Sequence, residues 1–348
     1  MNSPRAKRRT ALEGQSLTSM SPQISRRSFL HQSTALLATA PLLARGATTE
    51  SKDASSAALP RRVLGRTGME VSVLSFGSGS FFQKLPDGQW EPLVQRALDL
   101  GINYFDTASA YHFDKKNSHS EARIGQILRG RRKSVYVCTK LEERDPEKAK
   151  QELESSLKRL QMDYVDVLMA HSMVETETDI AALEKGIYAQ LRKFKEEGMA
   201  KHIGFSSMMT NGPRIKQLIE ALDPEVALIA LSAAKYGDVA EHAMPAAQAH
   251  KTGVIAMKAL RDVVGKGATA KELLHYSFNR AGVASLCVAH SKMDELEQNV
   301  KTVSGFPQQA AVGSGEALER RLAHLATPEV LAWARPGYRD SGNDTPLA

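Results

Sequence analysis

The chain alternates eight times between a short apolar run and a longer segment, and no other feature constrains its fold as strongly. Short runs rich in β-branched and aromatic residues are typical of parallel strands that are buried on both faces. The runs are Val71–Phe76, Ile102–Phe105, Val135–Thr139, Tyr164–Met169, His202–Phe205, Val226–Leu231, Val254–Met257 and Ala284–Val288. Eight strands that are each followed by a helix predict a closed (β/α)₈ barrel, the TIM barrel, in a single domain.

The segments between the runs have the residue spacing of amphipathic helices. In Ile180–Glu197, the most periodic of them, apolar residues recur every three or four positions, which places them on one face of a helix. Three further helices are predicted at Glu91–Leu100, Ser120–Leu128 and Glu147–Leu160. Three glycines follow helical segments just before strands, where a left-handed helix terminus favours glycine: Gly101, Gly198 and Gly253.

An open, doubly wound sheet is the alternative fold. Such a sheet normally carries a G-x-G-x-x-G turn after its first strand. The corresponding turn here, Phe76–Ser80, lacks the third glycine. We therefore interpret Gly77 and Ser78 as a turn that lets a ligand approach the backbone closely. Upstream, Arg62–Leu64 and the two glycines after it predict a small hairpin that closes the bottom of the barrel.

The positive charge of the chain is concentrated at its N-terminal end. Of the formal net charge of +7, residues 1–47 contribute seven basic residues and one acidic residue, or +6, which leaves +1 for all later residues. Binding of nucleic acid requires a clustered basic surface. Because none remains in the body of the chain, we do not predict a nucleic-acid partner.

Residues 1–58 resemble a twin-arginine signal sequence followed by a linker. Arg26 and Arg27 precede Phe29-Leu30 and the apolar run Ser33–Ala44, a pattern that directs bacterial proteins to the twin-arginine export machinery. An amphipathic helix with two incidental arginines is the alternative. The apolar run is too short for a membrane-spanning helix, which needs about 20 residues. We expect export to the periplasm or the outside of the cell, and because this route carries folded proteins, it suggests a bound cofactor.

Two cysteines, Cys138 and Cys287, each lie in a predicted strand. A disulfide is compatible with an oxidising compartment, but two separate buried thiols are the favoured interpretation. The chain has no C-x-x-C, no H-E-x-x-H and no cluster of histidines and cysteines. The sequence therefore predicts no metal site.

Polar residues follow three consecutive strands of the predicted barrel. Asp106, Lys140 and His171 come at or just after the ends of the second, third and fourth runs, and Tyr111 lies in the loop after Asp106. The loops at these strand ends build the active sites of (β/α)₈ barrels. Each residue alone has an ordinary structural explanation, such as a helix cap or a surface lysine. Together, ionisable groups next to apolar strands need partners, because an unpaired buried charge is costly.

These residue types suit proton donation to a carbonyl. A phenol is a poor acid at neutral pH, but a neighbouring cation favours the phenolate and lowers its pKa. We therefore expect Asp106 to hold Lys140 as a cation beside Tyr111, which donates a proton to a carbonyl oxygen. His171 then helps to place that carbonyl or tunes the tyrosine. No nucleophile is included, so the set favours addition of a hydride from a nicotinamide coenzyme.

The same residues resemble the aldo-keto reductase family. The resemblance extends from about Arg62 to Asn299, and its motifs are Leu64–Gly68, Asp106–Tyr111, Glu121–Gly125, Thr139-Lys140, Asp163–Asp166, His171 and Gly204–Ser207. It implies an NAD(P)H-dependent reductase of aldehydes or ketones with Asp106, Tyr111, Lys140 and His171 as its catalytic residues. The alternative is a slow, redox-sensing or accessory subunit that binds the coenzyme, as some relatives do. The intact set of four favours the enzyme.

The resemblance also implies contacts to the nicotinamide half of the coenzyme. Ser206 and Ser207 match the pair that holds the nicotinamide carboxamide, although the family usually has asparagine at the second position. The sixth run, Val226–Leu231, lacks the usual glutamine and aromatic residue. Lys258 stands where a Ser-Pro pair is common, and we expect it either at the coenzyme pyrophosphate or facing solvent.

At the adenosine end, the resemblance implies contacts from Glu295 and Asn299 to the ribose and adenine. Glu295 replaces an arginine that often pairs with a 2′-phosphate and would repel that group. Lys292 is the nearest substitute cation, so NADP(H) is favoured, with NAD(H) as the alternative. Residues 59–304 are predicted to form the barrel. Residues 305–348 do not match the family and are expected to form a helix, Gly315–Leu325, and a mobile tail.

Overall fold

The computed structural model describes residues 59–79, 81–112, 119–306, 315–335 and 338. The predicted signal sequence at residues 1–58 lies outside these described residues, and so does the end of the predicted tail. In the described part of the chain, no helix is both long enough and apolar enough to cross a lipid bilayer.

Eight parallel strands form a closed barrel, as predicted. Their order around the barrel follows the chain, and β10 pairs with β3 to close it. The strands are β3 (Leu74–Gly77), β4 (Tyr104–Asp106), β5 (Tyr136–Leu141), β6 (Val165–Met173), β7 (Ala200–Ser207), β8 (Val226–Ala230), β9 (Gly253–Met257) and β10 (Val283–Ala289). Almost every strand residue is buried, which explains why the runs are continuously apolar instead of alternating.

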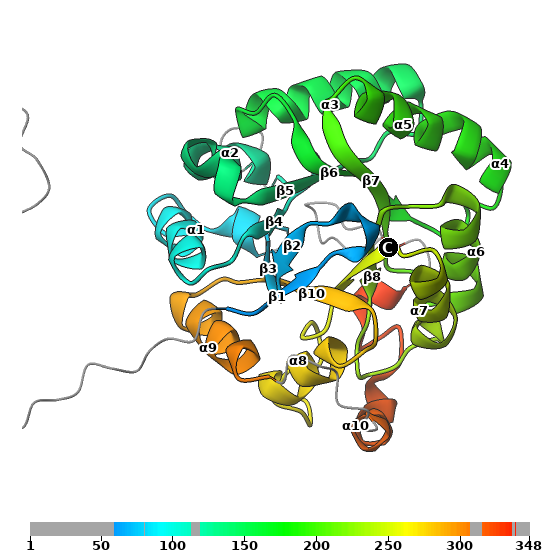
Figure 1. Cartoon of the computed structure of the whole chain (residues 1–348). Coiled ribbons are helices and arrows are strands. Elements are labelled where there is room, and N and C mark those ends of the chain that lie inside the picture. The colour runs from blue at the N-terminus through cyan, green and yellow to red at the C-terminus, as the bar shows by residue number, and fades with distance from the viewer. Residues whose placement is uncertain (1–58, 80, 113–118, 307–314, 336–337, 339–348) are drawn as a thin grey trace, which may run out of the picture. The chain divides into compact units, whose positions relative to one another are not determined.

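Helices surround the barrel, one after nearly every strand (Figure 1). Their apolar faces pack on the strands, and the caps follow the sequence. In α3, for example, Asp145 accepts a hydrogen bond from Lys148 N and Pro146 is the first helical residue, both favourable at a helix start. The helices are α1 (Trp90–Asp99), α2 (Ser120–Leu128), α3 (Pro146–Leu160), α4 (Ile180–Leu183), α5 (Ala189–Glu196), α6 (Gly212–Leu222), α7 (Val239–Ala249), α8 (Ala270–Phe278), α9 (Met293–Ser304) and α10 (Glu316–Leu322).

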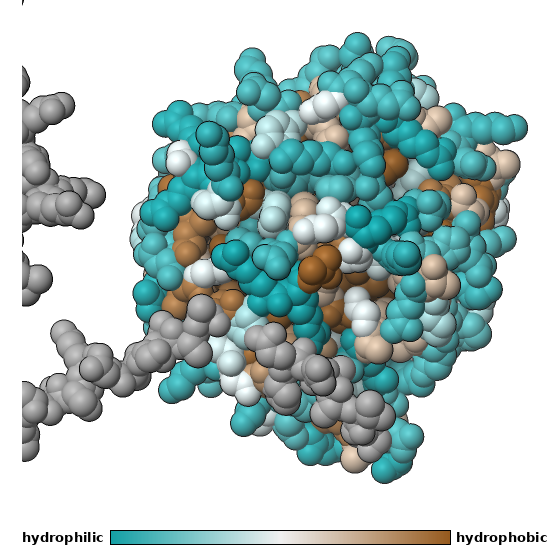
Figure 2. Space-filling model, viewed as in Figure 1, coloured by the Kyte–Doolittle hydropathy of each residue, from teal (hydrophilic) through white to brown (hydrophobic). Residues whose placement is uncertain are grey.

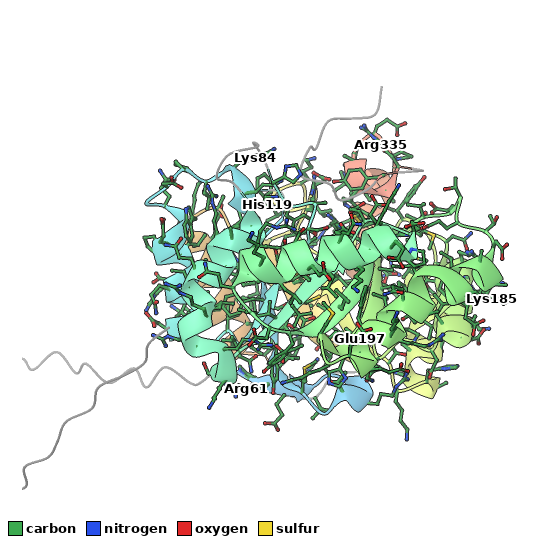
Figure 3. All side chains as sticks on the ribbon, turned by 90° about the horizontal axis from the view of Figure 1, so that it is seen from above. Arg61, Lys84, His119, Lys185, Glu197 and Arg335 are labelled. Atoms are coloured by element: carbon green, nitrogen blue, oxygen red, sulfur yellow. The ribbon has the colours of Figure 1, made fainter. Side chains whose placement is uncertain are left out.

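A hairpin closes one end of the barrel, as predicted. It consists of β1 (Arg61–Val63) and β2 (Glu70–Ser72), which pair antiparallel. Arg61 lies at this end, and Lys84, His119 and Arg335 lie at the opposite end (Figure 3). The hairpin end is mainly hydrophilic, with hydrophobic residues in small separate areas (Figure 2). The loops that carry Lys84 and His119 therefore lie at the end of the barrel opposite the hairpin.

Two local predictions were wrong, and one predicted helix is interrupted. The run Val71–Phe76 is two strands, because the backbone of Val73 turns away to bond with Pro60 O at 3.0 Å and Leu286 N at 2.9 Å. The helix Ile180–Glu197 contains a π-helical segment at Glu184–Tyr188, where Gly186 departs from helical geometry. Gly253 is not a left-handed terminus: it begins β9, and a Cβ there would lie 2.6 Å from Leu64 of the hairpin turn. Glycine is needed for this close approach.

The C-terminal segment that did not match the family packs against the barrel. Leu322, Leu331 and Trp333 are buried in one cluster with Leu228 and Met257, which lie on β8 and β9. The predicted helix is present as α10 and a short 3₁₀ turn that ends at residue 325. The described residues 315–335 of this segment therefore contribute to the folded core of the barrel.

Both cysteines are free thiols, as favoured from the sequence. Cys138 lies in β5 and Cys287 in β10. Burial raises the pKa of both thiols well above the ordinary value of cysteine, so both stay protonated at neutral pH. Neither cysteine is therefore poised as a nucleophile.

Candidate active site

The four residues that the sequence singled out come together at the loop end of the barrel. Asp106 is the last residue of β4, Lys140 is in β5 and His171 is in β6. Lys140 and His171 were predicted just after their strands, but β5 extends past Lys140 to Leu141 and β6 extends past His171 to Met173. Parallel strands in sequential order place the three side chains on adjacent strands.

Lys140 and Asp106 form a buried ion pair. Lys140 Nζ lies 2.7 Å from Asp106 Oδ2 and also donates to Thr107 O at 2.7 Å. The lysine side chain is 0% exposed and that of the aspartate 5%. Burial acts to lower the pKa of Lys140, but the charge of Asp106 raises it, and the net pKa lies above the ordinary value of lysine. A permanent cation is thus held inside the site.

Tyr111 lies close to both this cation and His171. Lys140 Nζ is 4.9 Å from the centre of the phenol ring, and the His171 ring centre is 5.5 Å away in an edge-on arrangement. Tyr111 is only 4% exposed, and its ring packs on Gly79, where a Cβ would come within 3.0 Å of it. The phenol is therefore fixed next to the cation, the imidazole and the pocket described below.

The backbone around His171 is irregular. The pairing of β6 with β7 shifts register between Ala170 and Met173, and Ser172 has a left-handed φ of 46°. Such a conformation is costly for a residue with a side chain and is common at functional sites. It is held by a hydrogen bond of 2.9 Å from Ser172 N to Ser206 Oγ. The irregularity sets the direction of His171 at the end of β6.

Arg144, which sequence reasoning did not single out, stabilises this region through hydrogen bonds. Arg144 donates to His171 O at 2.6 Å and to Glu142 O at 3.1 Å. Its guanidinium is also paired with Glu177, with 2.6 Å between Nε and Oε1. No motif marks these residues, because the contacts join loops after β5 and β6 that are far apart in the sequence. Arg144 thus fixes the ends of two strands that carry site residues.

A pocket of about 530 Å³ opens beside Tyr111. Its size is within the range of small-molecule sites. Asp106 and Tyr111 form part of its wall. Of the residues predicted to bind the coenzyme, four line it: Gly77, Lys258, Glu295 and Asn299. Two of the four predicted catalytic residues, Asp106 and Tyr111, and half of the expected coenzyme residues therefore line one pocket.

The other predicted coenzyme residues do not line this pocket. Ser78 donates through both its N and its Oγ to Asp106 O, at 2.9 Å each. Ser206 Oγ accepts from Ser172 N, and Ser207 Oγ donates to Met173 O at 2.8 Å. Lys292 is exposed at the start of α9. The three serines therefore hold the backbone around Asp106 and His171.

The loop after β9 supplies pocket residues that were not all predicted. Lys258 and Asp262 both have a φ of 64°, which is unusual for residues with side chains. Arg261, which sequence reasoning did not single out, also lines the pocket. Glu295 also lines the pocket, and its Oε2 accepts a hydrogen bond from Ser291 N at 3.2 Å. The lining therefore combines two cations, Lys258 and Arg261, with three carboxylates, those of Asp106, Asp262 and Glu295.

His290, at the end of β10, also lines the pocket and was not predicted. Its Nε2 lies 3.2 Å from Asn299 Nδ2, and burial lowers its pKa to about 4. The folded chain thus keeps this imidazole neutral at pH values where an unfolded chain, with a histidine pKa of about 6.5, takes up a proton. Stability from this residue is present above about pH 6.5 and is lost as the pH falls towards 4.

We expect the free energy of unfolding to fall by about 2 kcal/mol between pH 7 and pH 5 on account of His290 alone. Urea denaturation of the wild type and of His290→Gln at both pH values measures this contribution. The variant should lose about 2 kcal/mol less than the wild type. Equal losses in the two proteins would show that His290 is not held neutral.

Known proteins resemble this chain over most of its length. The sequence profile of the Aldo/keto reductase family matches residues 73–272. L-galactose dehydrogenase of Arabidopsis thaliana is 26% identical, over 77% of this chain and 96% of that protein. A solved protein of Pseudomonas aeruginosa, named as a candidate aldo-keto reductase, is 28% identical with a TM-score of 0.60, over 70% of this chain and 94% of its own. The holo form of an aldo-keto reductase of Bacillus halodurans, 22% identical, has the same fold, with a TM-score of 0.62 over 77% of this chain and 97% of its own.

Proposed function

Because the chain belongs to the aldo/keto reductase family, we propose that it reduces the carbonyl of an aldehyde or ketone to an alcohol with a nicotinamide coenzyme. One observation carries the proposal. Tyr111 forms part of the wall of a pocket large enough for a ligand. The buried cation of Lys140 lies 4.9 Å from the centre of the Tyr111 ring. This arrangement suits an acid that protonates an oxygen inside the pocket.

Each of the four residues has a distinct part in this proposal. Tyr111 donates its hydroxyl proton to the carbonyl oxygen as negative charge develops there. The cation of Lys140 stabilises the phenolate that remains, and Asp106 keeps that cation in place through its 2.7 Å contact. His171 takes part in placing the substrate next to Tyr111. All four are buried, so water is largely excluded and the electrostatic effects are strong.

The pocket fits a nicotinamide dinucleotide. Gly77 and Gly79 line it and lack side chains that would fill the space, and Lys258 and Arg261 bring positive charge suited to a pyrophosphate. Asn299 and Glu295 offer polar groups for the ribose and adenine. When bound, the coenzyme supplies the hydride for the carbonyl carbon.

The nucleotide preference depends on Glu295 in this proposal. Its carboxylate lines the pocket, whereas Lys292 is exposed and outside the lining. A carboxylate near a 2′-phosphate repels it by an energy on the order of 1 kcal/mol or more. We propose that Glu295 lowers the affinity for NADPH relative to NADH.

Fluorescence titration with both coenzymes tests the binding proposal. Glu295→Gln should raise the ratio of NADPH to NADH affinity by about tenfold. Glu297→Gln is a matched control, because Glu297 is on the same helix but pairs with Arg96 outside the pocket. An unchanged ratio in Glu295→Gln would contradict the role of Glu295. Binding of neither coenzyme by the wild type would contradict the proposed function.

The substrate is proposed only as a small carbonyl compound. The relative named L-galactose dehydrogenase covers 77% of this chain, so sugars and other hydroxylated aldehydes and ketones belong in any substrate screen. Simple alkyl aldehydes and ketones are the necessary comparison.

A further inference from the structure

The tyrosine of the site ends a tight turn. Residues Ala108–Tyr111 form this turn, which is closed by a hydrogen bond of 3.1 Å from Tyr111 N to Ala108 O. Ser109, its second residue, donates through its N to Lys140 O at 3.1 Å. The turn therefore lies directly on the backbone of the lysine whose cation is 4.9 Å from the centre of the phenol ring. The separation of the phenol from the cation thus depends on the position of Ser109.

One carboxylate holds Ser109 from a helix outside the barrel strands. Glu152, on α3, accepts a hydrogen bond from Ser109 Oγ at 2.5 Å. It also accepts from Glu142 N at 3.1 Å and from Glu143 N at 3.0 Å. These two amides belong to the loop that follows β5, whereas Ser109 belongs to the loop that follows β4. Glu152 therefore ties the ends of two strands that carry site residues to each other.

Glu152 contacts the turn but not the pocket. In the described part of the chain it is not among the residues that line the pocket. Its partner Ser109 is only 8% exposed, and a buried hydroxyl without a partner is costly. Hydrogen bonds to an ionised acceptor are about twice as strong as those to a neutral one. Glu152 is therefore suited to hold the turn firmly, and it affects the reaction only through the turn.

We propose that Glu152 is a positioning residue for carbonyl reduction: through Ser109 it keeps Tyr111 at the distance from the buried cation at which the phenol is an effective acid. The proposal rests on the proposed function for its reaction but not for the hold on the turn. A displacement of about 1 Å at a reacting group lowers a rate by up to about 10²-fold. Ser120 N also donates to Tyr111 O, at 2.9 Å, so loss of Glu152 should displace the tyrosine only in part.

Reduction of a carbonyl compound by Ser109→Ala and Glu152→Ala tests this connection. Each variant should lower kcat/KM for the carbonyl by about tenfold, while the affinity for the coenzyme stays within about twofold of the wild type. Because both changes remove the same contact, the double variant should be at most about threefold slower than Glu152→Ala. Ser109→Thr keeps a hydroxyl and should stay within about threefold of the wild type. Glu154→Ala is the matched control, because Glu154 is exposed on the same helix.

The pH dependence separates a positioning role from a loss of folded protein. A phenol acts as an acid only while it is protonated, so reduction falls as the pH rises above the pKa of the acid. With the phenol farther from the cation, its anion is less stabilised, and the fall should move to higher pH by about half a unit or more in Glu152→Ala. A sample with less folded enzyme is less active at every pH, and its fall stays in place. An unmoved fall, or wild-type kcat/KM in Ser109→Ala and Glu152→Ala, would overturn the inference.

Hydrogen exchange of the full-length protein, followed by mass spectrometry, measures the hold on the turn without any substrate. The peptide that contains Ser109 and Tyr111 should exchange at least about threefold faster in Glu152→Ala than in the wild type, and at the wild-type rate in Glu154→Ala. Equal exchange in Glu152→Ala and the wild type would also overturn the inference. If the wild type reduces no carbonyl compound, the proposed function fails, and the exchange rates still decide whether Glu152 holds the turn.

Discussion

Replacing Tyr111 with phenylalanine should lower the rate of carbonyl reduction by about 10²- to 10⁴-fold, the usual contribution of a general acid. The change removes the only proton that the ring can donate and keeps the ring itself. Its packing on Gly79 and its edge-on contact with His171 should therefore persist. Coenzyme affinity should stay within about threefold of the wild type, because a lost transition-state contact lowers kcat without weakening binding.

Tyr136→Phe is the matched control for this variant. Tyr136 is the first residue of β5, at the end of the barrel away from the site, so the same loss of a hydroxyl should leave the rate unchanged. Steady-state kinetics and coenzyme fluorescence measure both quantities. Full activity of Tyr111→Phe would show that another group supplies the proton.

Lys140→Met should lower the free energy of unfolding by about 3–5 kcal/mol as well as abolish reduction. Removing one partner of a buried ion pair leaves the other charge buried and unpaired, and here that charge is on Asp106, whose side chain is 5% exposed. The pKa of Lys140 is raised in the folded chain. Its stabilising effect is therefore complete below about pH 10 and is lost only as the pH rises further. Urea denaturation at pH 7 thus measures the whole effect.

A second variant separates stability from chemistry. Asp106→Asn combined with Lys140→Met removes both charges, so the loss in unfolding free energy should shrink to about 2 kcal/mol or less. Reduction should stay abolished, because no cation remains beside Tyr111. A double variant as unstable as Lys140→Met would mean that the lysine stabilises the barrel through contacts other than its pair with Asp106.

The sequence was sufficient to predict the barrel and to predict that Asp106, Lys140 and His171 lie on adjacent strands. Buried parallel strands need continuous apolar runs, so a polar residue such as Asp106 at the end of one is conspicuous. Sequential strands in a barrel are neighbours, so residues on three consecutive strands must meet. Both properties can be read from the order of residues alone.

Contacts between loops could not be predicted in the same way. Ser206 and Ser207 were expected after the fifth barrel strand, but they are the last two residues of β7. Their hydroxyls form hydrogen bonds with the backbone at Ser172 and Met173. The partners of these hydroxyls depend on the irregular end of β6, which no residue spacing in the sequence predicts. The roles of Arg144 and His290 likewise depend on which loops approach each other.

The central claim is that Tyr111 protonates a carbonyl that receives a hydride inside this pocket. The most direct measurement supplies carbonyl compounds together with NADPH or NADH deuterated at the position that donates the hydride, and follows the alcohol product by mass spectrometry. We predict that the wild type forms alcohol with one deuterium at the former carbonyl carbon, and that Tyr111→Phe forms this product at least about 10²-fold more slowly. Alcohol without deuterium, or equal labelling by the two proteins, would contradict the account.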